Sequence, residues 1–186
     1  MVNCASKKIR KTLEPQDITA IQDTREQNPL DLRPLLTRVG TLTTADYSVE
    51  GLEHCIALER KSLQDLVMCV GRERERFDRE VQRLLAYPVK GLIIEANICQ
   101  IELKQYRGDV HPNAVLSSVM GWMARGLPIM WVNDHATAGK MAAKFLYVAA
   151  KRYWLQAYPF LMAQVSPDKP QPTAAEAPHS DKAPAQ

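Results

Sequence analysis

Apolar positions repeat with two different periods in this chain, and the two periods alternate along it. Five segments are continuously apolar or alternate in steps of two, as buried and half-buried strands do. These segments span residues 18–24, 39–49, 54–61, 91–96 and 128–132. Between the second and third of them, residues 50–53 have the sequence Glu-Gly-Leu-Glu, which predicts a hairpin.

Other segments repeat apolar residues in steps of three and four, the period of a helix. They cover residues 30–36, 62–70, 73–87, 113–125 and 137–154. The clearest has one apolar stripe formed by Phe77, Val81, Leu84 and Leu85. Ser62 can act as the N-cap of the second segment, and Gly71 can close it. Strands that alternate with helices predict an α/β fold, with helices flanking a central mixed sheet.

Composition indicates one domain with two less regular ends. Hydrophobic residues make up 46% of the 186 residues and charged residues 24%, which is typical of a globular domain. Residues 1–16 are predicted to be a flexible basic N-terminus, and residues 17–158 the domain. From Pro159 on, half of the twelve prolines are interleaved with Ala, Gln and Ser. We therefore expect residues 159–186 to be a largely disordered tail.

Charge and cysteine content limit the functional classes. The net charge of +3 mildly favours a polyanionic partner. No run of about 18 apolar residues is present, so no membrane span is expected. The four cysteines form no C-x-x-C pair and no zinc-ligand spacing. Cys55, Cys69 and Cys99 lie in apolar segments, and we expect them to be buried free thiols in a reducing compartment.

The candidate chemistry lies at the end of the third predicted strand. Asp46 precedes it, and Glu59 and Lys61 follow in the sequence Glu-x-Lys. The period of two places Glu59 and Lys61 on one face and Arg60 on the other. Two carboxylates can hold a hard divalent cation, and a lysine beside them can face a phosphate. Glu59 and Lys61 alone could equally form a solvent-face ion pair.

Four short segments together resemble the nuclease domain of the XPF/Mus81 (ERCC4-type) structure-specific endonucleases. They are Asp23-Thr24-Arg25-Glu26, Asp46-Tyr47, Glu59-Arg60-Lys61 and, after three further residues, Asp65. The resemblance covers roughly residues 18–156. Ala45 departs from it, because the family usually has glycine before the aspartate. Since alanine disfavours positive φ, we expect altered geometry at this bend and retained activity.

The resemblance implies a restriction-endonuclease-like fold and DNA cleavage with Mg²⁺ or Mn²⁺. The implied catalytic residues are Asp23, Asp46, Glu59, Arg60, Lys61 and Asp65. Asp23, Asp46 and Glu59 would hold the metal. Lys61 would orient the water and stabilise the phosphate, and Arg60 would pair with an acid such as Asp65.

Candidate DNA contacts come from arginines around this motif. They are Arg25, Arg72, Arg76 and Arg79. The charged residues 72–76 are also consistent with a solvated helix face laced with charge pairs. We expect His111 to be exposed in a turn, and His54 and His135 to be structural or solvated.

The sequence therefore predicts a metal-dependent DNA endonuclease, acting on branched or flapped structures in repair or recombination. Two alternatives are a catalytically weak DNA-binding or scaffolding subunit and a sequence-specific restriction enzyme. The family's helix-hairpin-helix module does not follow in this sequence, so substrate choice would fall to the nuclease body or a partner. Members pair through the nuclease domain, which predicts a homodimer or a heterodimer with a related chain. We expect the cytoplasm of a prokaryote or its virus, near the nucleoid, or the nucleus of a eukaryote.

Overall fold

Six strands form one mixed sheet in the computed structural model, which describes residues 9–165. They are β1 (Thr19–Asp23), β2 (Leu36–Gly40), β3 (Tyr47–Val49), β4 (Ile56–Ser62), β5 (Val89–Glu95) and β6 (Ile129–Val132). Their order across the sheet is β2-β1-β3-β4-β5-β6. β3 runs antiparallel to both its neighbours, and the other pairs are parallel. The sheet thus has the predicted mixed character, with the early hairpin antiparallel.

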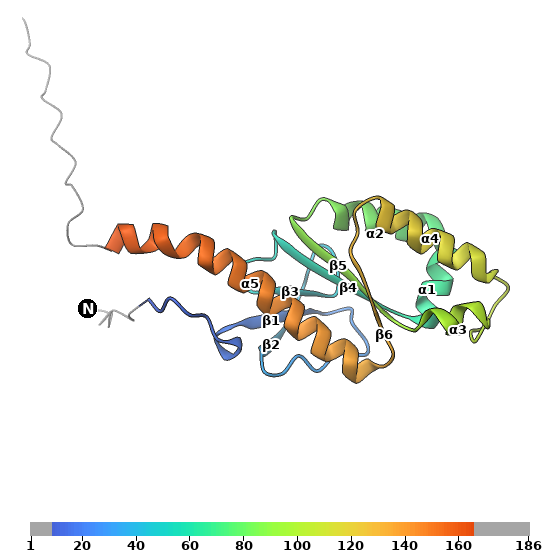
Figure 1. The fold of residues 1–186 in the computed structure, drawn as a ribbon, viewed down its shortest axis with the longest axis horizontal. Coiled ribbons are helices and arrows are strands. Elements are labelled where there is room, and N and C mark those ends of the chain that lie inside the picture. The colour runs from blue at the N-terminus through green and yellow to red at the C-terminus, as the bar shows by residue number, and fades with distance from the viewer. Residues whose placement is uncertain (1–8, 166–186) are drawn as a thin grey trace, which may run out of the picture.

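Helices cover both faces of this sheet (Figure 1). One face carries α1 (Leu63–Val70), α2 (Arg74–Leu85), α3 (Ile98–Glu102) and α4 (Pro112–Ala124). The other face carries α5 (His135–Val165), beside the short 3-10 helix η1 (Pro15–Asp17). The C-terminal part of α5 projects past the end of the sheet (Figure 1). No helix within residues 9–165 has the length and apolar character needed to cross a bilayer.

β4 contributes side chains to two hydrophobic clusters, one on each face of the sheet, as its alternating sequence predicts. Ile56 and Leu58 pack in the cluster under α5, whereas Ala57 packs in the cluster under α1, α2 and α4. Consecutive strand residues point to opposite faces, so each cluster receives every second residue. The same alternation continues into the charged end of the strand.

The turn from β4 into α1 also follows the prediction. Ser62 caps the helix: its hydroxyl accepts a hydrogen bond from the Asp65 backbone N–H, at 3.2 Å. Gly71 ends the helix, and its N–H donates to the Val67 carbonyl. This short connection fixes where α1 starts relative to the charged end of β4.

The segment 30–49 is not organised as predicted. Residues 30–35 form turns and extended backbone in place of a helix, and the predicted strand 39–49 is two separate strands, β2 and β3. Three leucines account for the helix-like period of the segment, yet each is buried under α5. Pro34 lacks a backbone N–H, and the Leu30 N–H donates to the Tyr47 hydroxyl at 2.9 Å. Both features favour an irregular loop over a helix.

Within the described residues, the start of the predicted tail is helical and the end of the predicted N-terminal segment contacts α5. α5 continues to Val165, with Pro159 inside it, so residues 159–165 are helical. Strong helix formers surround this single proline, which costs one backbone hydrogen bond at an exposed position. At the other end, the Trp154 indole N–H donates to the Lys11 carbonyl at 3.1 Å, which ties residues 9–16 to α5. Residues 1–8 and 166–186 lie outside the described part of the chain.

The cysteines within the described residues are free thiols, as expected, but they differ in burial. Cys69 is buried and Cys55 partly buried, whereas Cys99 is exposed. Cys99 lies on the short helix α3, which turns Ile101 inward instead.

Candidate active site

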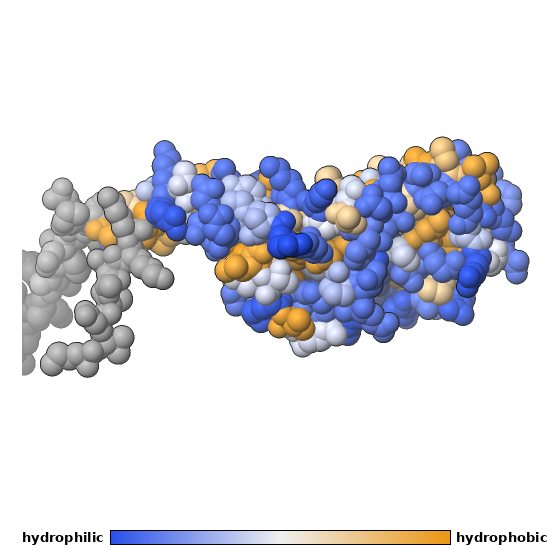
Figure 2. All heavy atoms as spheres, turned by 90° about the horizontal axis from the view of Figure 1, so that it is seen from below, coloured by the Kyte–Doolittle hydropathy of each residue, from blue (hydrophilic) through white to orange (hydrophobic). Residues whose placement is uncertain are grey.

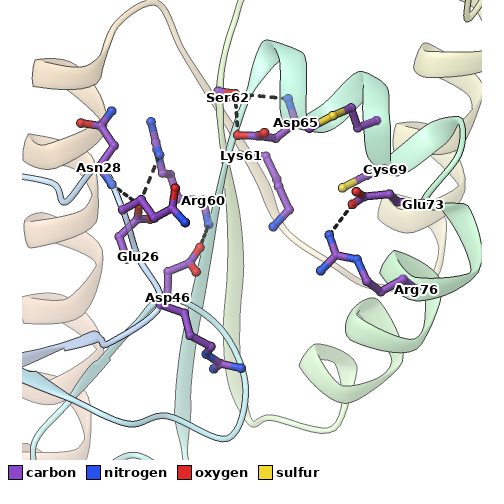
Figure 3. A pocket seen from close by; sticks show the side chains of 13 residues that line it. Glu26, Asn28, Asp46, Arg60, Lys61, Ser62, Asp65, Cys69, Glu73 and Arg76 are labelled. Carbon is purple, nitrogen blue, oxygen red and sulfur yellow. Dashed lines mark hydrogen bonds and ion pairs between the residues drawn. The ribbon is translucent and has the colours of Figure 1, made fainter.

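A polar hollow of about 430 Å³ opens at the C-terminal end of β4. The loop after β1, residues 25–28, forms one wall, and α1 and the start of α2 form the other. Asp46 and Lys61 lie between these walls, with Glu73 and Arg76 on the far side (Figure 3). The hollow therefore combines carboxylates with cations at a single strand end.

Glu59 lies below this hollow and is almost fully buried, at 1% exposure. Its Oε1 accepts a charge-assisted hydrogen bond from Lys61 Nζ. Its Oε2 is buried and has no hydrogen-bond partner among the described residues. Burial raises the pKa of Glu59 well above its usual value, although the Lys61 charge opposes this. An unpartnered buried carboxylate oxygen is costly and marks a position that suits a ligand.

Lys61 is held between this carboxylate and an aromatic ring. Its Nζ lies 5.1 Å from the centre of the Phe77 ring on α2. Burial alone would lower the pKa of Lys61, but the charges of Glu59, Glu80 and Asp46 raise it. Lys61 therefore stays protonated and can act as a fixed positive charge.

Asp46 stands beside the same strand, just before β3. Its Oδ2 accepts a hydrogen bond from the Arg60 backbone N–H at 2.9 Å (Figure 3). Burial raises the pKa of Asp46 to about 6, against the lowering effect of the Lys61 charge. Glu26 and Glu80 raise it further, since both are negative neighbours. The site thus gathers more negative charge than Lys61 alone offsets.

Ala45, the one departure from the motif, adopts the conformation that glycine would adopt. Its φ is 68°, in the left-handed region. For an alanine this conformation costs roughly 1–2 kcal/mol. The chain thus bends in the left-handed region before Asp46 despite the alanine, and the strain lies next to the site.

Asp23 is placed differently from Asp46 and Glu59. Its Oδ1 accepts hydrogen bonds from the Arg25 N–H and guanidinium, and its Oδ2 accepts one from the Leu42 N–H. Burial acts to raise the pKa of Asp23, but these hydrogen bonds outweigh it and the pKa is lowered. The carboxylate is thus engaged at both oxygens, and it does not line the hollow.

Arg60 points to the opposite face of β4 and does not pair with Asp65. Its guanidinium donates to both oxygens of Glu95 on β5, at 2.8 and 3.0 Å, and lies 3.6 Å from Glu26. The His135 Nδ1 lies 2.9 Å from Glu95, which links the start of α5 to the same cluster. Asp65 instead accepts a hydrogen bond from the Ser62 hydroxyl, at 2.6 Å. The alternation along β4 therefore places the Glu59–Lys61 pair and the Arg60 cluster on opposite faces of the strand, although Arg60 and Glu26 still line the hollow.

Arg60→Ala is expected to lower the free energy of unfolding by about 3–5 kcal/mol, because it leaves Glu95 and Glu26 buried without their cation. Chemical denaturation followed by circular dichroism measures this. Arg33→Ala is the matched control: it removes an arginine–aspartate pair, with Asp31, that is solvent-exposed. A similar loss of stability in both variants would contradict the buried cluster as its cause.

Comparisons with known proteins place this geometry in a family. The model of the ERCC4 domain matches residues 6–145, which is most of the chain. The chain belongs to the ERCC4 domain family. Among solved structures, XPF from Aeropyrum pernix matches with a TM-score of 0.58 and 17% identity, over 80% of this chain and 74% of that one. XPF from Aeropyrum pernix in complex with DNA matches with a TM-score of 0.58 and 19% identity, over 76% and 74%. No curated protein matches in sequence.

These likenesses bear on the fold of this ERCC4 domain. The mixed sheet with flanking helices is the fold of the XPF structures, as the sequence resemblance implied. At 17–19% identity they do not extend to individual side chains. The roles of those side chains depend on the geometry of this chain.

Two acids in the ERCC4 domain belong to the site although the sequence analysis did not select them as catalytic residues. Glu26 lines the hollow and faces Arg60. Glu80 on α2 acts on the pKa values of Asp46, Glu59 and Lys61. Its position three residues after Phe77, next to the apolar stripe of α2, was the signal available in the sequence.

The four candidate DNA-binding arginines occupy different surroundings. Arg76 lines the hollow and pairs with Glu73, and Arg25 lines it and pairs with Asp23. Arg72 and Arg79 are exposed on the outer side of α2 and the turn before it. The histidine predictions agree with the structure: His111 and His54 are exposed, and His135 is part of the Glu95 cluster.

The oxygen donors at the hollow can be compared with what a divalent cation requires. Within residues 9–165, no group of three His, Cys, Asp or Glu side chains is close enough to hold a metal ion. Asp46 and Glu59 nevertheless supply hard oxygen donors, and Glu59 Oε2 has no other partner. The residues present therefore fit a cation bound by two carboxylates, with water supplying further ligands.

Proposed function

We propose that this ERCC4 domain is a metal-dependent endonuclease that hydrolyses phosphodiester bonds in DNA. One observation carries the proposal: the buried, unpartnered Oε2 of Glu59 lies beside a protonated lysine, under a hollow that Asp46 lines. A buried polar atom without a hydrogen-bond partner is destabilising, and such atoms are typical of functional sites.

Asp46 and Glu59 would hold Mg²⁺ or Mn²⁺. The cation supplies positive charge against the negative charge that develops on the phosphate during hydrolysis. Asp23 was predicted as a third ligand, but hydrogen bonds occupy both its oxygens. We propose instead that Asp23 holds Arg25 in place, together with the loop that carries Glu26.

Lys61 would provide a second positive charge at the phosphate. Its position over the Phe77 ring restricts the ammonium group to the inner side of the hollow. Arg25 and Arg76 at the rim can contact neighbouring phosphates, since both line the hollow and are exposed. Arg60 and Asp65 act as positioning residues: Arg60 holds Glu26 and Glu95, and Asp65 holds the start of α1.

The substrate proposed is branched or flapped DNA, as in repair or recombination. The XPF structure from Aeropyrum pernix that was solved with DNA supports a nucleic-acid partner for this fold. The polar lining of the hollow also suits a backbone phosphate better than an apolar ligand.

A second copy or a related chain is the proposed protein partner, bound along α5. Met141, Val148 and Leu155 recur every seven residues on this helix and are 40%, 52% and 48% exposed. On the face drawn in Figure 2, apolar side chains reach the surface in patches, including the region beside the grey residues. Sedimentation of the purified chain measures whether it is a monomer.

A catalytically weak DNA-binding subunit is the second candidate. It is favoured by the Lys61 ammonium group, which occupies one oxygen of Glu59 and would compete with a cation. Such a subunit would bind branched DNA and leave it intact.

Incubation with labelled DNA distinguishes the candidates. With Mg²⁺ or Mn²⁺, the protein is expected to cut 3′-flap, splayed-arm or four-way-junction DNA more than about tenfold faster than plain duplex. EDTA should abolish cutting and leave binding in place. Binding without cutting, in either metal, would establish the scaffolding role. Cutting of plain duplex at one fixed sequence would instead indicate a restriction enzyme.

A further inference from the structure

α5 has an unusual charge composition. Its 31 residues contain four Lys and Arg residues and no aspartate or glutamate. These cations are Lys140, Lys144, Lys151 and Arg152. The charge of these four cations exceeds the net charge of the whole chain, which is +3. The positive charge of this protein is thus concentrated on one helix, on the opposite face of the sheet from α1 and α2.

Three of these cations share one face of the helix. Lys140, Lys144 and Lys151 are spaced i, i+4 and i+11, which aligns them over about 16 Å of helix length. Tyr147 lies between them, and the Nζ atoms of Lys144 and Lys151 are 5.9 and 5.5 Å from its ring centre. The Tyr147 hydroxyl is itself fixed, since it donates to the Leu13 carbonyl at 3.0 Å. The lysines are therefore partly positioned by the ring.

No carboxylate among residues 9–165 forms a salt bridge with these lysines. The nearby acids have other partners. Asp134, which interacts electrostatically with Lys140, accepts hydrogen bonds from the Thr137 N–H and hydroxyl. Asp31 pairs with Arg33, and Asp17 pairs with Arg10. The lysine face thus remains available to an external anion.

The lysine face is connected to the active site by a single stretch of chain. A hollow of about 320 Å³ is lined by Arg33, Pro34, Lys140, Lys144 and Tyr147. The backbone of α5 at Gly139 lies so close to Asp31 that an added Cβ would be 2.5 Å from its carbonyl oxygen. The loop that starts at Arg25 in the active-site hollow therefore ends against the lysines.

We propose that Lys140, Lys144 and Lys151 bind the phosphate backbone of a second DNA arm, outside the arm that is cut. This inference rests on the proposed function and assigns it a substrate-binding surface. Lysines that follow one helix face and form no salt bridge with an acid suit backbone phosphates, which repeat regularly and are read without sequence preference. A branched substrate has the additional arm that such a surface requires.

The test is DNA binding in EDTA, so that no cleavage occurs. Fluorescence anisotropy gives the Kd for three-arm DNA and for a short linear duplex, at several salt concentrations. The triple variant Lys140→Ala/Lys144→Ala/Lys151→Ala is expected to bind three-arm DNA roughly tenfold or more weakly. The slope of log K against log salt should fall by about 2–3, near 0.9 for each phosphate that the variant no longer neutralises. Its affinity for the short duplex should change much less.

The triple Lys→Arg variant is the matched control, because it retains the charges, and it should bind like the wild type. Wild-type affinity and slope in the triple Ala variant would overturn the inference and leave the proposed function standing. Absence of DNA binding by the wild type would overturn both. If the Ala variant loses a dimer in sedimentation and weakens on both DNAs equally, the face is a protein interface, which also overturns the inference.

Discussion

Glu59→Gln is expected to slow metal-dependent DNA cleavage by about 10³-fold, which corresponds to roughly 4 kcal/mol in the activation barrier. The amide has the shape of the carboxylate but no charge, so it is a poor ligand for a hard cation. Folding should be preserved, because the amide oxygen can still accept the Lys61 hydrogen bond, and Asp46 and Glu80 still oppose the Lys61 charge. Single-turnover cleavage of a labelled flap substrate at saturating enzyme measures the effect.

Glu75→Gln makes the same chemical change on the exposed side of α2 and should keep the wild-type rate. Binding of the Glu59→Gln variant to DNA in EDTA should also match the wild type. A rate within about tenfold of the wild type would show that Glu59 does not take part in the chemistry. Equal inactivity of the wild type and the variant would favour the scaffolding role.

Asp46→Asn is expected to make the metal-free protein more stable at neutral pH. Burial raises the pKa of Asp46 to about 6, from an ordinary value of 3.8. Between these two pH values the folded state binds more protons than the unfolded state, so stability falls as pH rises. Above pH 6 the cost is fully present, about 3 kcal/mol at about 1.4 kcal/mol per pKa unit. Asparagine cannot ionise and avoids this cost, while it can still accept the Arg60 N–H bond.

Thermal denaturation in EDTA from pH 4 to pH 8 measures the difference. The Tm advantage of Asp46→Asn should be near zero at pH 4, grow as the pH rises, and reach its full size above pH 6. Adding Mg²⁺ should raise the Tm of the wild type and not that of the variant, because the cation stabilises only a fold that binds it. Asp109→Asn, in an exposed loop, should follow the wild type throughout. Equal Mg²⁺ shifts in wild type and Asp46→Asn would argue against a metal at this position.

Local patterns predicted the parts of the fold that depend on neighbouring residues. The period of two along β4 placed Glu59 and Lys61 on one face, and the Ser62 cap placed the start of α1. Both outcomes follow from backbone geometry within a few residues. The burial of Phe77 and Val81 on α2 followed in the same way.

Partners distant in the sequence could not be predicted. Arg60 was expected to pair with Asp65, its neighbour in the motif, but Glu95 lies 35 positions away and is brought close by the pairing of β4 with β5. The leucines of residues 30–35 had a helical period, yet the hydroxyl of Tyr47 and the ring of Pro34 fixed a loop. The left-handed conformation of Ala45 is similarly imposed by tertiary structure against the preference of alanine.

The two faces of β4 carry different functions, which restricts changes in the length of this strand. One face of the strand end carries Glu59 and Lys61, and the other carries Arg60 in its buried cluster. A single inserted or deleted codon between Ile56 and Glu59 would exchange the two faces. The arginine would then point toward α1 and α2, and the acid and the lysine would point toward Glu95. A single substitution along this strand affects one face at a time, whereas a change of length by one residue would disable the site and the interior together.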